Sequence, residues 1–411
     1  MQKTFLSILF ILAMPQFFTH RKGVVTDNTQ TSTMQPNSHS VIDANNKFGF
    51  NFFKTVLQQD TSASNKLISP LSIYLALSMV YNGADNATKD SIANTLQLSG
   101  ISIDELNNAS HKLTRQLAGE DRQVQLSIAN SIWYNKNVQP VPSFPASVSN
   151  FYDASVKPLD FSSPTSVAEI NNWVNKNTGN KIPKVIDKIN PGDLMYLINA
   201  IYFNGAWQHA FKKDATANDI FNLQNGSTVS VPFMNQQFIT NTFSDNSFSM
   251  IELPYGKGKN YSMYILLPVN AQQTISSFAS SMNETLLKNA IGKMDSSRIR
   301  LSLPSWEAAY SIDNMKPELS SLGMGIAFSN NADFSKMYSN GKVNITKAVH
   351  KTYIKVNEQG TIAAATTSIG MHAMAVFIPL IKINRPFMYA IIEKKSGAVL
   401  FLGTVNNPSL H

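Results

Sequence analysis

The residues of this chain that could carry out chemistry are few. There is no cysteine, and the histidines number seven: His20, His39, His111, His209, His350, His372 and His411. The absence of cysteine excludes disulfide bonds, thiol nucleophiles and metal sites built on cysteine. The sequence has no H-E-x-x-H pair for zinc, no G-x-x-x-x-G-K-S/T phosphate loop and no G-x-S-x-G elbow around a nucleophilic serine. We therefore expect no enzyme, no metal site and no cofactor.

One stretch near the C-terminus has an unusual composition. Residues 349–356 alternate as a strand, and residues 357–360 read NEQG. From Thr361 to Pro379 the chain has no Asp, Glu, Lys or Arg, and nearly every side chain up to Thr367 is Ala or Thr. Small uncharged residues of this kind could slide between two existing strands and add a strand to a sheet. The ordinary alternative is an edge strand or an Ala-rich helical turn.

The first residues have the composition of a secretory signal. Lys3 precedes an apolar run from Phe5 to Met14, and a run of about ten residues is too short to cross a bilayer. We expect residues 1–22 to be a signal peptide, and residues 23–42, rich in Thr, Ser, Asn and Gln, to be a polar mobile tail. The protein is then secreted and extracellular, or periplasmic if its source is a Gram-negative bacterium.

The rest of the chain has an ordinary charge balance. The 34 basic and 26 acidic residues give a net charge of +8 over 411 residues. Residues 1–22 hold three basic and no acidic residues, so +5 remains without them. No concentrated basic face and no second long apolar run is visible, so we expect neither nucleic acid nor a membrane as a partner. The length suits about two to three domains, or one large domain, because no linker interrupts residues 43–408.

The elements that must position any site are mixed. Phe48 and Phe52 recur at helical spacing, and Ser69 followed by proline is typical of a helix start. Residues 388–393 and 398–405 are apolar runs joined by KKSG, the pattern of a hairpin. Because helices come early and strands late, the sequence favours an α+β fold over a regular βαβ alternation.

Several spaced motifs resemble those of one family, the serpins. The matching stretches are NKLISPLSI at 65–73, NAIYFNGAW at 199–207, VNEQGT at 356–361 with the Ala/Thr run behind it, INRPF at 383–387 and residues 401–408. In order, they resemble the start of the second helix, the strand-and-breach motif and the hinge of the reactive-centre loop. The last two stretches together resemble the C-terminal signature. The motifs occur in family order over residues 43–408.

The resemblance implies a single serpin domain over residues 43–408, with three β-sheets, about nine helices and an exposed reactive-centre loop. It also implies a suicide inhibitor. A serine protease attacks the loop as a substrate, and the freed hinge then inserts into the main sheet and traps the acyl-enzyme. The implied partner is the target serine protease in a covalent complex, with a cysteine protease as a further option. The active inhibitor would be a monomer that polymerises on heating.

The resemblance further assigns the loop residues. Its hinge comprises Glu358, Gly360, Thr361, Ala363, Ala364, Ala365, Thr366 and Thr367. Counting about sixteen positions from Glu358 gives the scissile bond as Met374–Ala375, with Met371–His372 as the runner-up. A Met beside Ala suits the apolar pocket of an elastase-, chymotrypsin- or subtilisin-like protease better than a trypsin-like one.

The resemblance also identifies the moving parts of the sheet. The polar shutter beneath it would comprise Ser69, Ser72, Asn199 and His350. Trp207 would stand at the breach, where the loop first enters. The alternative within the family is a non-inhibitory serpin that serves as a carrier, chaperone or storage protein. Such members usually carry bulky or charged hinge residues, and this hinge has neither.

Overall fold

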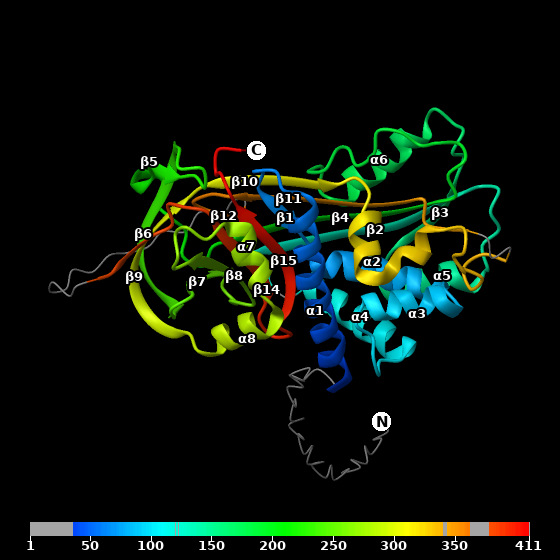
Figure 1. The fold of residues 1–411 in the computed structure, drawn as a ribbon, viewed down its shortest axis with the longest axis horizontal. Helices are drawn as coiled ribbons and strands as arrows, with labels where there is room; N and C mark the ends of the chain where they lie inside the picture. The colour runs from blue at the N-terminus through cyan, green and yellow to red at the C-terminus, as the bar shows by residue number, and fades with distance from the viewer. Residues whose placement is uncertain (1–35, 120, 122, 340–342, 362–377, 411) are drawn as a thin grey trace, which may run out of the picture. The chain divides into compact units, whose positions relative to one another are not determined.

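The computed structural model of the protein describes residues 36–119, 121, 123–339, 343–361 and 378–410 (Figure 1). Within these ranges the nine α-helices are α1 (Pro36–Gln59), α2 (Pro70–Gly83), α3 (Asn86–Thr95), α4 (Ile103–Gly119), α5 (Ser143–Tyr152), α6 (Ser166–Asn177), α7 (Ile275–Ser281), α8 (Glu284–Gly292) and α9 (Lys316–Leu319). None of the helices described is long and apolar enough to cross a membrane.

Helix α2 begins where the sequence predicts. The Ser69 side chain accepts a hydrogen bond from the Ser72 backbone N–H at 3.3 Å, and Pro70 occupies the first helical turn. Nearly all of α2 is buried, so it is a core helix and not an amphipathic surface helix. This burial fixes the position of Ser69 and Ser72 beneath the neighbouring sheet.

Helix α1 begins earlier than expected. The composition of residues 23–42 predicts a polar mobile tail, but the helix includes residues 36–42. Val41 and Ile42 are each 3% exposed, and Pro36 stands at the first helical position. The prediction is wrong for these seven residues because a polar composition also fits the solvent face of a helix. The remainder of the tail and the predicted signal peptide lie outside the described residues.

A six-stranded sheet carries the predicted moving parts. Its strands are β2 (Val124–Asn135), β3 (Ser155–Leu159), β4 (Met195–Ala206), β10 (Trp306–Ile312), β11 (Lys347–Val356) and β12 (Gly360–Thr361). Their order is β10-β11-β4-β2-β3, and β12 pairs with β4. β11 and β4 are parallel, whereas β2 and β4 are antiparallel. The central pair β4–β11 is the pair that a strand would have to separate in order to enter.

A nine-stranded sheet forms the other half of the fold. Its strands are β1 (Lys66–Ile68), β5 (Ala217–Asn222), β6 (Thr228–Ser244), β7 (Phe248–Tyr255), β8 (Tyr261–Pro268), β9 (Asp295–Pro304), β13 (Leu380–Lys382), β14 (Phe387–Glu393) and β15 (Ala398–Val405). The predicted hairpin is confirmed as β14–β15. Hydrogen bonding joins the three expected sheets into two networks, because the long β6 pairs with β5 and β9 along most of its length and with β7 at its end.

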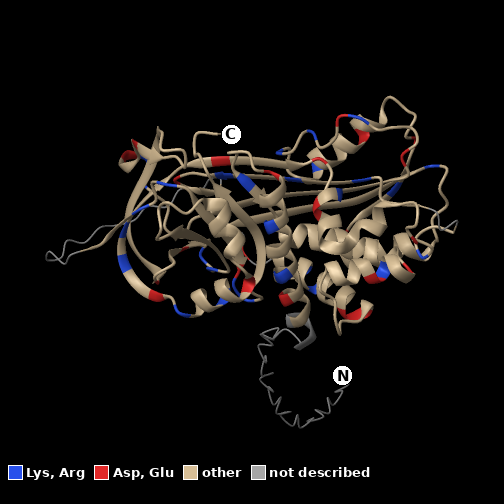
Figure 2. Cartoon of the chain, viewed as in Figure 1, with Lys and Arg blue, Asp and Glu red and all other residues tan. Residues whose placement is uncertain are grey.

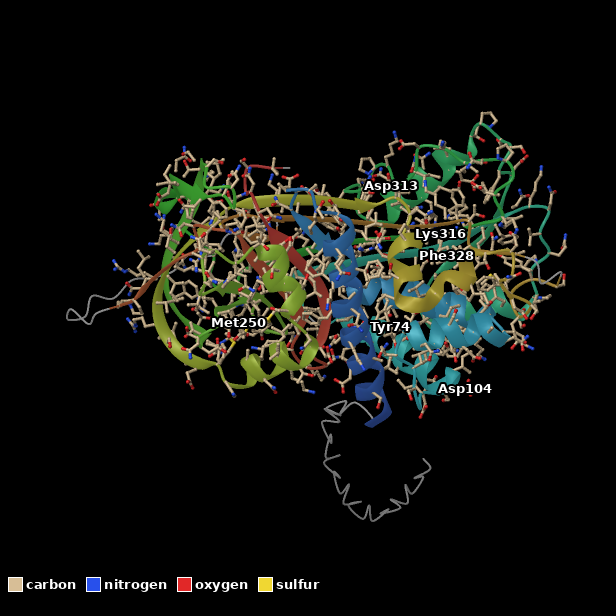
Figure 3. All side chains as sticks on the ribbon, viewed as in Figure 1. Tyr74, Asp104, Met250, Asp313, Lys316 and Phe328 are labelled. Atoms are coloured by element: carbon tan, nitrogen blue, oxygen red, sulfur yellow. The ribbon has the colours of Figure 1, made fainter. Side chains whose placement is uncertain are left out.

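The six-stranded sheet lies between two apolar layers. On one face Trp133, Tyr196 and Ile198 pack with Ile170 and Val174 of α6. The opposite face joins the main core with α2 (Figure 1). Figure 3 contrasts Tyr74 of α2, which lies in this core, with Asp104 of α4, which points away from it. The α+β fold expected from the order of elements is confirmed.

Candidate functional site

The candidate site lies where strands β4 and β11 separate. The two strands pair in parallel only as far as Tyr202 and Tyr353. Beyond this point the chain leaves β11, turns, and returns as β12, where Thr361 lies opposite Gly205 of β4. The returning chain is therefore a two-residue strand beside β4, at the end where β11 has left it.

Gly360 allows the chain to return in this way. Its φ angle of +131° lies in a region that residues with a side chain rarely adopt. A Cβ atom at this position would stand 2.1 Å from the carbonyl oxygen of Gly205. Glycine is thus required here both by the conformation and by the close approach of two backbones.

Thr361 is the first side chain of the hinge that lies inside the sheet. It is fully buried, and its Oγ1 lies 3.0 Å from the hydroxyl oxygen of Tyr255. Burial raises the pKa of Tyr255, so the phenol keeps its proton at neutral pH. The Tyr255–Thr361 hydrogen bond anchors the start of β12 to the neighbouring sheet.

Trp207 binds the turn at residues 357–360 from the β4 side. Its indole Nε1 donates to the Asn357 carbonyl at 2.9 Å, and its backbone N–H donates to the Gln359 carbonyl at 3.0 Å. The indole stacks on Tyr255, with ring centroids 4.4 Å apart and an interplanar angle of 16°. Trp207 therefore connects the turn to the same phenol that contacts Thr361.

Glu358 binds the segment that follows β4. Its Oε1 accepts a hydrogen bond from the Thr216 hydroxyl at 2.9 Å. Its carbonyl oxygen accepts one from the Phe211 backbone N–H at 2.7 Å. The turn is thus held on two sides, by Trp207 and by residues 211–216.

A second polar cluster crosses the middle of the same strand pair. The structure brings together the four predicted shutter residues, Ser69, Ser72, Asn199 and His350. Asn199 of β4 and His350 of β11 are register partners, and the His350 Nδ1 lies 2.5 Å from the Asn199 Oδ1. The Ser69 backbone N–H donates to the His350 Nε2 at 3.1 Å. His350 therefore links the N-terminus of α2 to both central strands.

These contacts define the tautomer of His350. Because Nε2 accepts from a backbone N–H, the proton of the neutral ring is on Nδ1, from which it is donated to Asn199. Complete burial lowers the pKa of His350 to about 3. The ring is accordingly neutral at physiological pH, and protonation would remove the acceptor that Ser69 needs.

The Asn199 amide completes the cluster. Its Nδ2 donates to the Ser72 carbonyl at 2.9 Å, to the Ser72 hydroxyl, and to the Asn130 Oδ1 at 2.5 Å. Sequence reasoning missed Asn130 and Tyr255. The only signal for Asn130 is its register opposite Asn199, which becomes visible once β2 is paired with β4.

Part of the predicted loop lies outside the described residues. This part comprises the hinge residues Ala363, Ala364, Ala365, Thr366 and Thr367, the expected bond Met374–Ala375 and the runner-up Met371–His372. The described chain resumes at Ile378 and enters β13, which pairs in parallel with β9.

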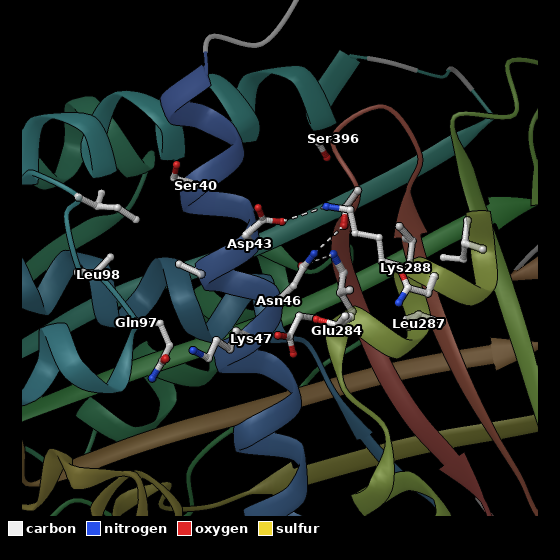
Figure 4. Close-up of a pocket in the computed structure, with 18 of the residues that line it drawn as sticks. Ser40, Asp43, Asn46, Lys47, Gln97, Leu98, Glu284, Leu287, Lys288 and Ser396 are labelled. Carbon is white, nitrogen blue, oxygen red and sulfur yellow. Dashed lines mark hydrogen bonds and ion pairs between the residues drawn. The ribbon is translucent and has the colours of Figure 1, made fainter. Parts of the chain in front are cut away.

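A separate cavity of about 1060 Å³ lies between α1, α8 and the β14–β15 hairpin (Figure 4). Its wall is mixed, with Leu98 and Leu287 beside charged side chains such as Lys47. Among the residues that line it, the Lys288 Nζ lies 3.8 Å from a carboxylate oxygen of Asp43. Within the residues described, no group of three or more acidic or histidine side chains could hold a metal ion.

Comparisons with known proteins agree with this geometry. The family model described as "Serpin (serine protease inhibitor)" matches residues 43–408. The leukocyte elastase inhibitor of Bos taurus is 33% identical over 377 residues, which cover 89% of this chain and 98% of that protein. Neuroserpin of Homo sapiens is 29% identical over 359 residues, covering 84% and 86% respectively.

Solved structures give the same result. The native thermophilic serpin tengpin superposes with a TM-score of 0.83 and 33% identity, covering 91% of this chain and 95% of tengpin. Human thyroxine-binding globulin, in complex with its ligand, gives a TM-score of 0.84 and 28% identity, covering 91% and 100%. The fold is thus that of a serpin. The chain belongs to the serpin family, whose members are generally protease inhibitors and not catalytic enzymes.

Proposed function

We propose that this serpin is a secreted suicide inhibitor of elastase-, chymotrypsin- or subtilisin-like serine proteases, cleaved at Met374–Ala375. The observation that carries the proposal is the pairing of Gly360 and Thr361 with β4 at the parted end of the β4–β11 pair. The similarity to a leukocyte elastase inhibitor supports an elastase-like target. We also propose that the active form is a monomer that polymerises on heating.

We expect the protein to follow the mechanism that the family implies. The protease serine attacks the Met374 carbonyl carbon, the bond to the Ala375 nitrogen breaks, and an ester to Met374 remains. The freed hinge then extends β12 between β4 and β11. Insertion must break seven pairs of register partners, from Tyr196–Lys347 to Tyr202–Tyr353, and the Asn199–His350 hydrogen bond among them.

The energetics favour insertion once the loop is cut. Each backbone hydrogen bond adds about 0.5–1.5 kcal/mol net, and a strand between two neighbours forms bonds on both sides. Gly205 and Ala206 already pair with the hinge, so the entering strand needs no new nucleation. Hydrolysis of the acyl-enzyme ester then competes with insertion of a strand whose first two residues, in β12, are already paired.

A protease panel tests the proposal directly. The protein, purified from the medium of an expressing host, is incubated with elastase, chymotrypsin, subtilisin and trypsin. We expect a detergent-resistant complex with one of the first three and a released peptide that begins at Ala375. Clean cleavage without a complex, by every protease that cuts the loop, would contradict the inhibitor proposal. Retention of the protein inside the host with residues 1–22 attached would contradict secretion.

A carrier function is the second candidate, and the cavity between α1, α8 and β14–β15 favours it. Its volume of about 1060 Å³ is large enough for a hormone-sized ligand. Thyroxine-binding globulin, one of the structural neighbours, is a serpin solved with thyroxine. Titration with thyroxine, followed by tryptophan fluorescence, tests this function. Saturable binding without any protease complex would favour the carrier.

A further inference from the structure

One exposed sheet face lies directly beside the point where the chain returns from the reactive loop. It is formed by β6, β9 and β13, where Leu380 is the register partner of Arg300, and Arg300 of Gln237. In the next row Arg298 is the partner of Ile239. We call these five residues, Gln237, Ile239, Arg298, Arg300 and Leu380, the β9 face.

The composition of the β9 face is unusual for a solvent-exposed sheet. Its inner side is ordinary core, because Ile299 and Leu301 are each 1% exposed. On the outer side Ile239 is 53% and Leu380 56% exposed, and both arginines are exposed as well. Two large apolar side chains beside two arginines resemble the composition of binding surfaces more than that of plain surface.

The charge of the β9 face is not compensated within the residues described. Among these described residues, neither Arg298 nor Arg300 forms an ion pair. Strands β6 and β13 contain no acidic residue. Asp295, the one acidic residue of β9, alternates to the other side of the strand from Arg298. The nearby Lys382 is already paired with Asp219 at 2.6 Å. Figure 2 shows the basic positions along β9.

The position of the β9 face determines what can reach it. The Arg300 backbone N–H donates to the Pro379 carbonyl at 2.9 Å, so the face is attached to the returning loop. Leu380 is six positions after Met374 in the chain, a span of at most about 22 Å. A protein interface usually covers about 800 Å² of each partner, which is more than an extended loop alone provides. A protease seated at Met374 would therefore extend over β13 and β9.

We propose that the β9 face is an accessory docking surface for the target protease, and that it binds an acidic, partly apolar surface beside the protease active site. This inference rests on the proposed inhibitory function. Arginine guanidinium groups bind carboxylates in a bidentate geometry and are favoured at interfaces. Their charge accelerates encounter, whereas Ile239 and Leu380 contribute contact area that salt does not screen.

The test compares rates of inhibition by matched variants. The parent, Arg298→Glu/Arg300→Glu and the control Lys54→Glu/Arg115→Glu are measured against the panel protease that forms a complex with the parent. The protease is used as purified and after succinylation of its lysines, which makes its surface acidic. Lys54 and Arg115 are exposed residues of α1 and α4, away from β9 (Figure 1). Each variant replaces two basic residues by two glutamates, so both change the net charge equally.

With the succinylated protease at low ionic strength, we expect the Arg298→Glu/Arg300→Glu variant to be about tenfold slower than the parent. The control should remain within about twofold, and the difference should shrink as salt is added. An Arg298→Ala/Arg300→Ala variant, which avoids like-charge repulsion from the added carboxylates, should show a smaller loss in the same direction. Equal rates for the β9-face variant and the control would overturn the docking surface.

The design separates the two proposals. If the parent forms no complex with any protease, the inhibitory function fails, and the docking surface falls with it. If the parent forms complexes and the β9-face variants match their control, only the docking surface fails. The stoichiometry of inhibition should stay unchanged in every variant, because none of these residues lies in the hinge or the shutter.

Discussion

Two polar clusters along β4 and β11, the breach around Trp207 and Thr361 and the shutter around His350, are built in opposite ways. At the breach the strands have already parted, and the turn at residues 357–360 and Thr361 are held by an indole, a phenol and a glycine contact. At the shutter the strands remain paired, and His350 and Asn199 join them through buried side chains. In the proposed insertion, a strand would enter at one end of this strand pair and would have to break the contacts in its middle. We therefore expect the shutter, and not the first contact of the hinge, to limit the proposed insertion.

The largest expected effect comes from blocking the prepared end. In Thr361→Arg, a charged side chain would have to occupy a fully buried position, at a cost of several kcal/mol. We expect the variant to be cleaved as a substrate, with at least about a hundredfold less complex relative to cleaved protein. Denaturing gels measure this partition. Thr361→Ser, which keeps the hydroxyl, is the control, and an undiminished yield of complex with Thr361→Arg would refute the role of the breach.

The next effect comes from removing the glycine that lets the chain return. Gly360→Ala combines an unfavourable φ with a Cβ that would lie 2.1 Å from the Gly205 carbonyl oxygen. A cost of about 1–3 kcal/mol is expected, and β12 should detach from β4. Urea unfolding and tryptophan fluorescence report both changes. The control is Gly192→Ala, where the added methyl group meets open space; equal midpoints for the two variants would contradict the close approach.

The shutter gives a pH-dependent effect on stability. The pKa of His350 is about 3 in the folded protein, below the usual value of 6.5, so the unfolded chain binds a proton more readily. The free energy of unfolding is therefore unaffected by His350 above about pH 6.5. As pH falls from 6.5 towards 3, it decreases by up to about 1.4 kcal/mol per pH unit.

This slope should be smaller in His350→Gln, where only other groups such as the partly buried His209 still contribute, and that variant should also polymerise at a lower temperature. Thermal midpoints between pH 7 and 4, with size-exclusion chromatography after warming, measure both effects. His111→Gln, which changes a histidine on α4, is the matched control and should keep the slope. If His350→Gln retains the pH slope of the parent and stays monomeric on warming, the shutter does not limit opening.

The smallest effect is expected from Trp207→Phe. The phenyl ring can keep the stack on Tyr255, but the hydrogen bond to the Asn357 carbonyl is lost. We expect a loss of about 1 kcal/mol in unfolding free energy and earlier release of the turn from β4. Trp173→Phe is the control, since Trp173 packs against Trp133 and away from the hinge. Faster protease cleavage of the loop in Trp207→Phe alone would show that the indole holds the turn, and equal rates in both variants would contradict this role.

Local patterns predicted much of the fold. The start of α2 follows from Ser69 and the proline behind it, and the β14–β15 hairpin from two apolar runs around a short polar turn. Both depend on residues that are near neighbours in the chain. The start of α1 was missed because a polar composition describes the exposed side of a helix as well as it describes a tail.

The candidate site was predictable only in part. The motif resemblance gave Ser69, Ser72, Asn199 and His350, which do form one cluster. Asn130 and Tyr255 were not foreseen, since their contacts join residues 69 and 106 positions apart. Asn130 reaches Asn199 through strand pairing, and Tyr255 reaches Thr361 from the other sheet. The β9 face arises in the same way, because its apolar and basic residues are neighbours only across three strands.

The hydrogen bonds of the shutter all run in one direction. The Ser69 N–H donates to His350, the ring donates to Asn199, and the amide donates to Ser72 and Asn130. A rotation of the Asn199 amide would place donor against donor on one side and acceptor against acceptor on the other, so the contacts are lost together. We therefore expect the hydrogen bonds of the shutter to break cooperatively and not one after another. The interval between loop cleavage and strand insertion would then have the statistics of a single rare event, with one rate constant for the whole population.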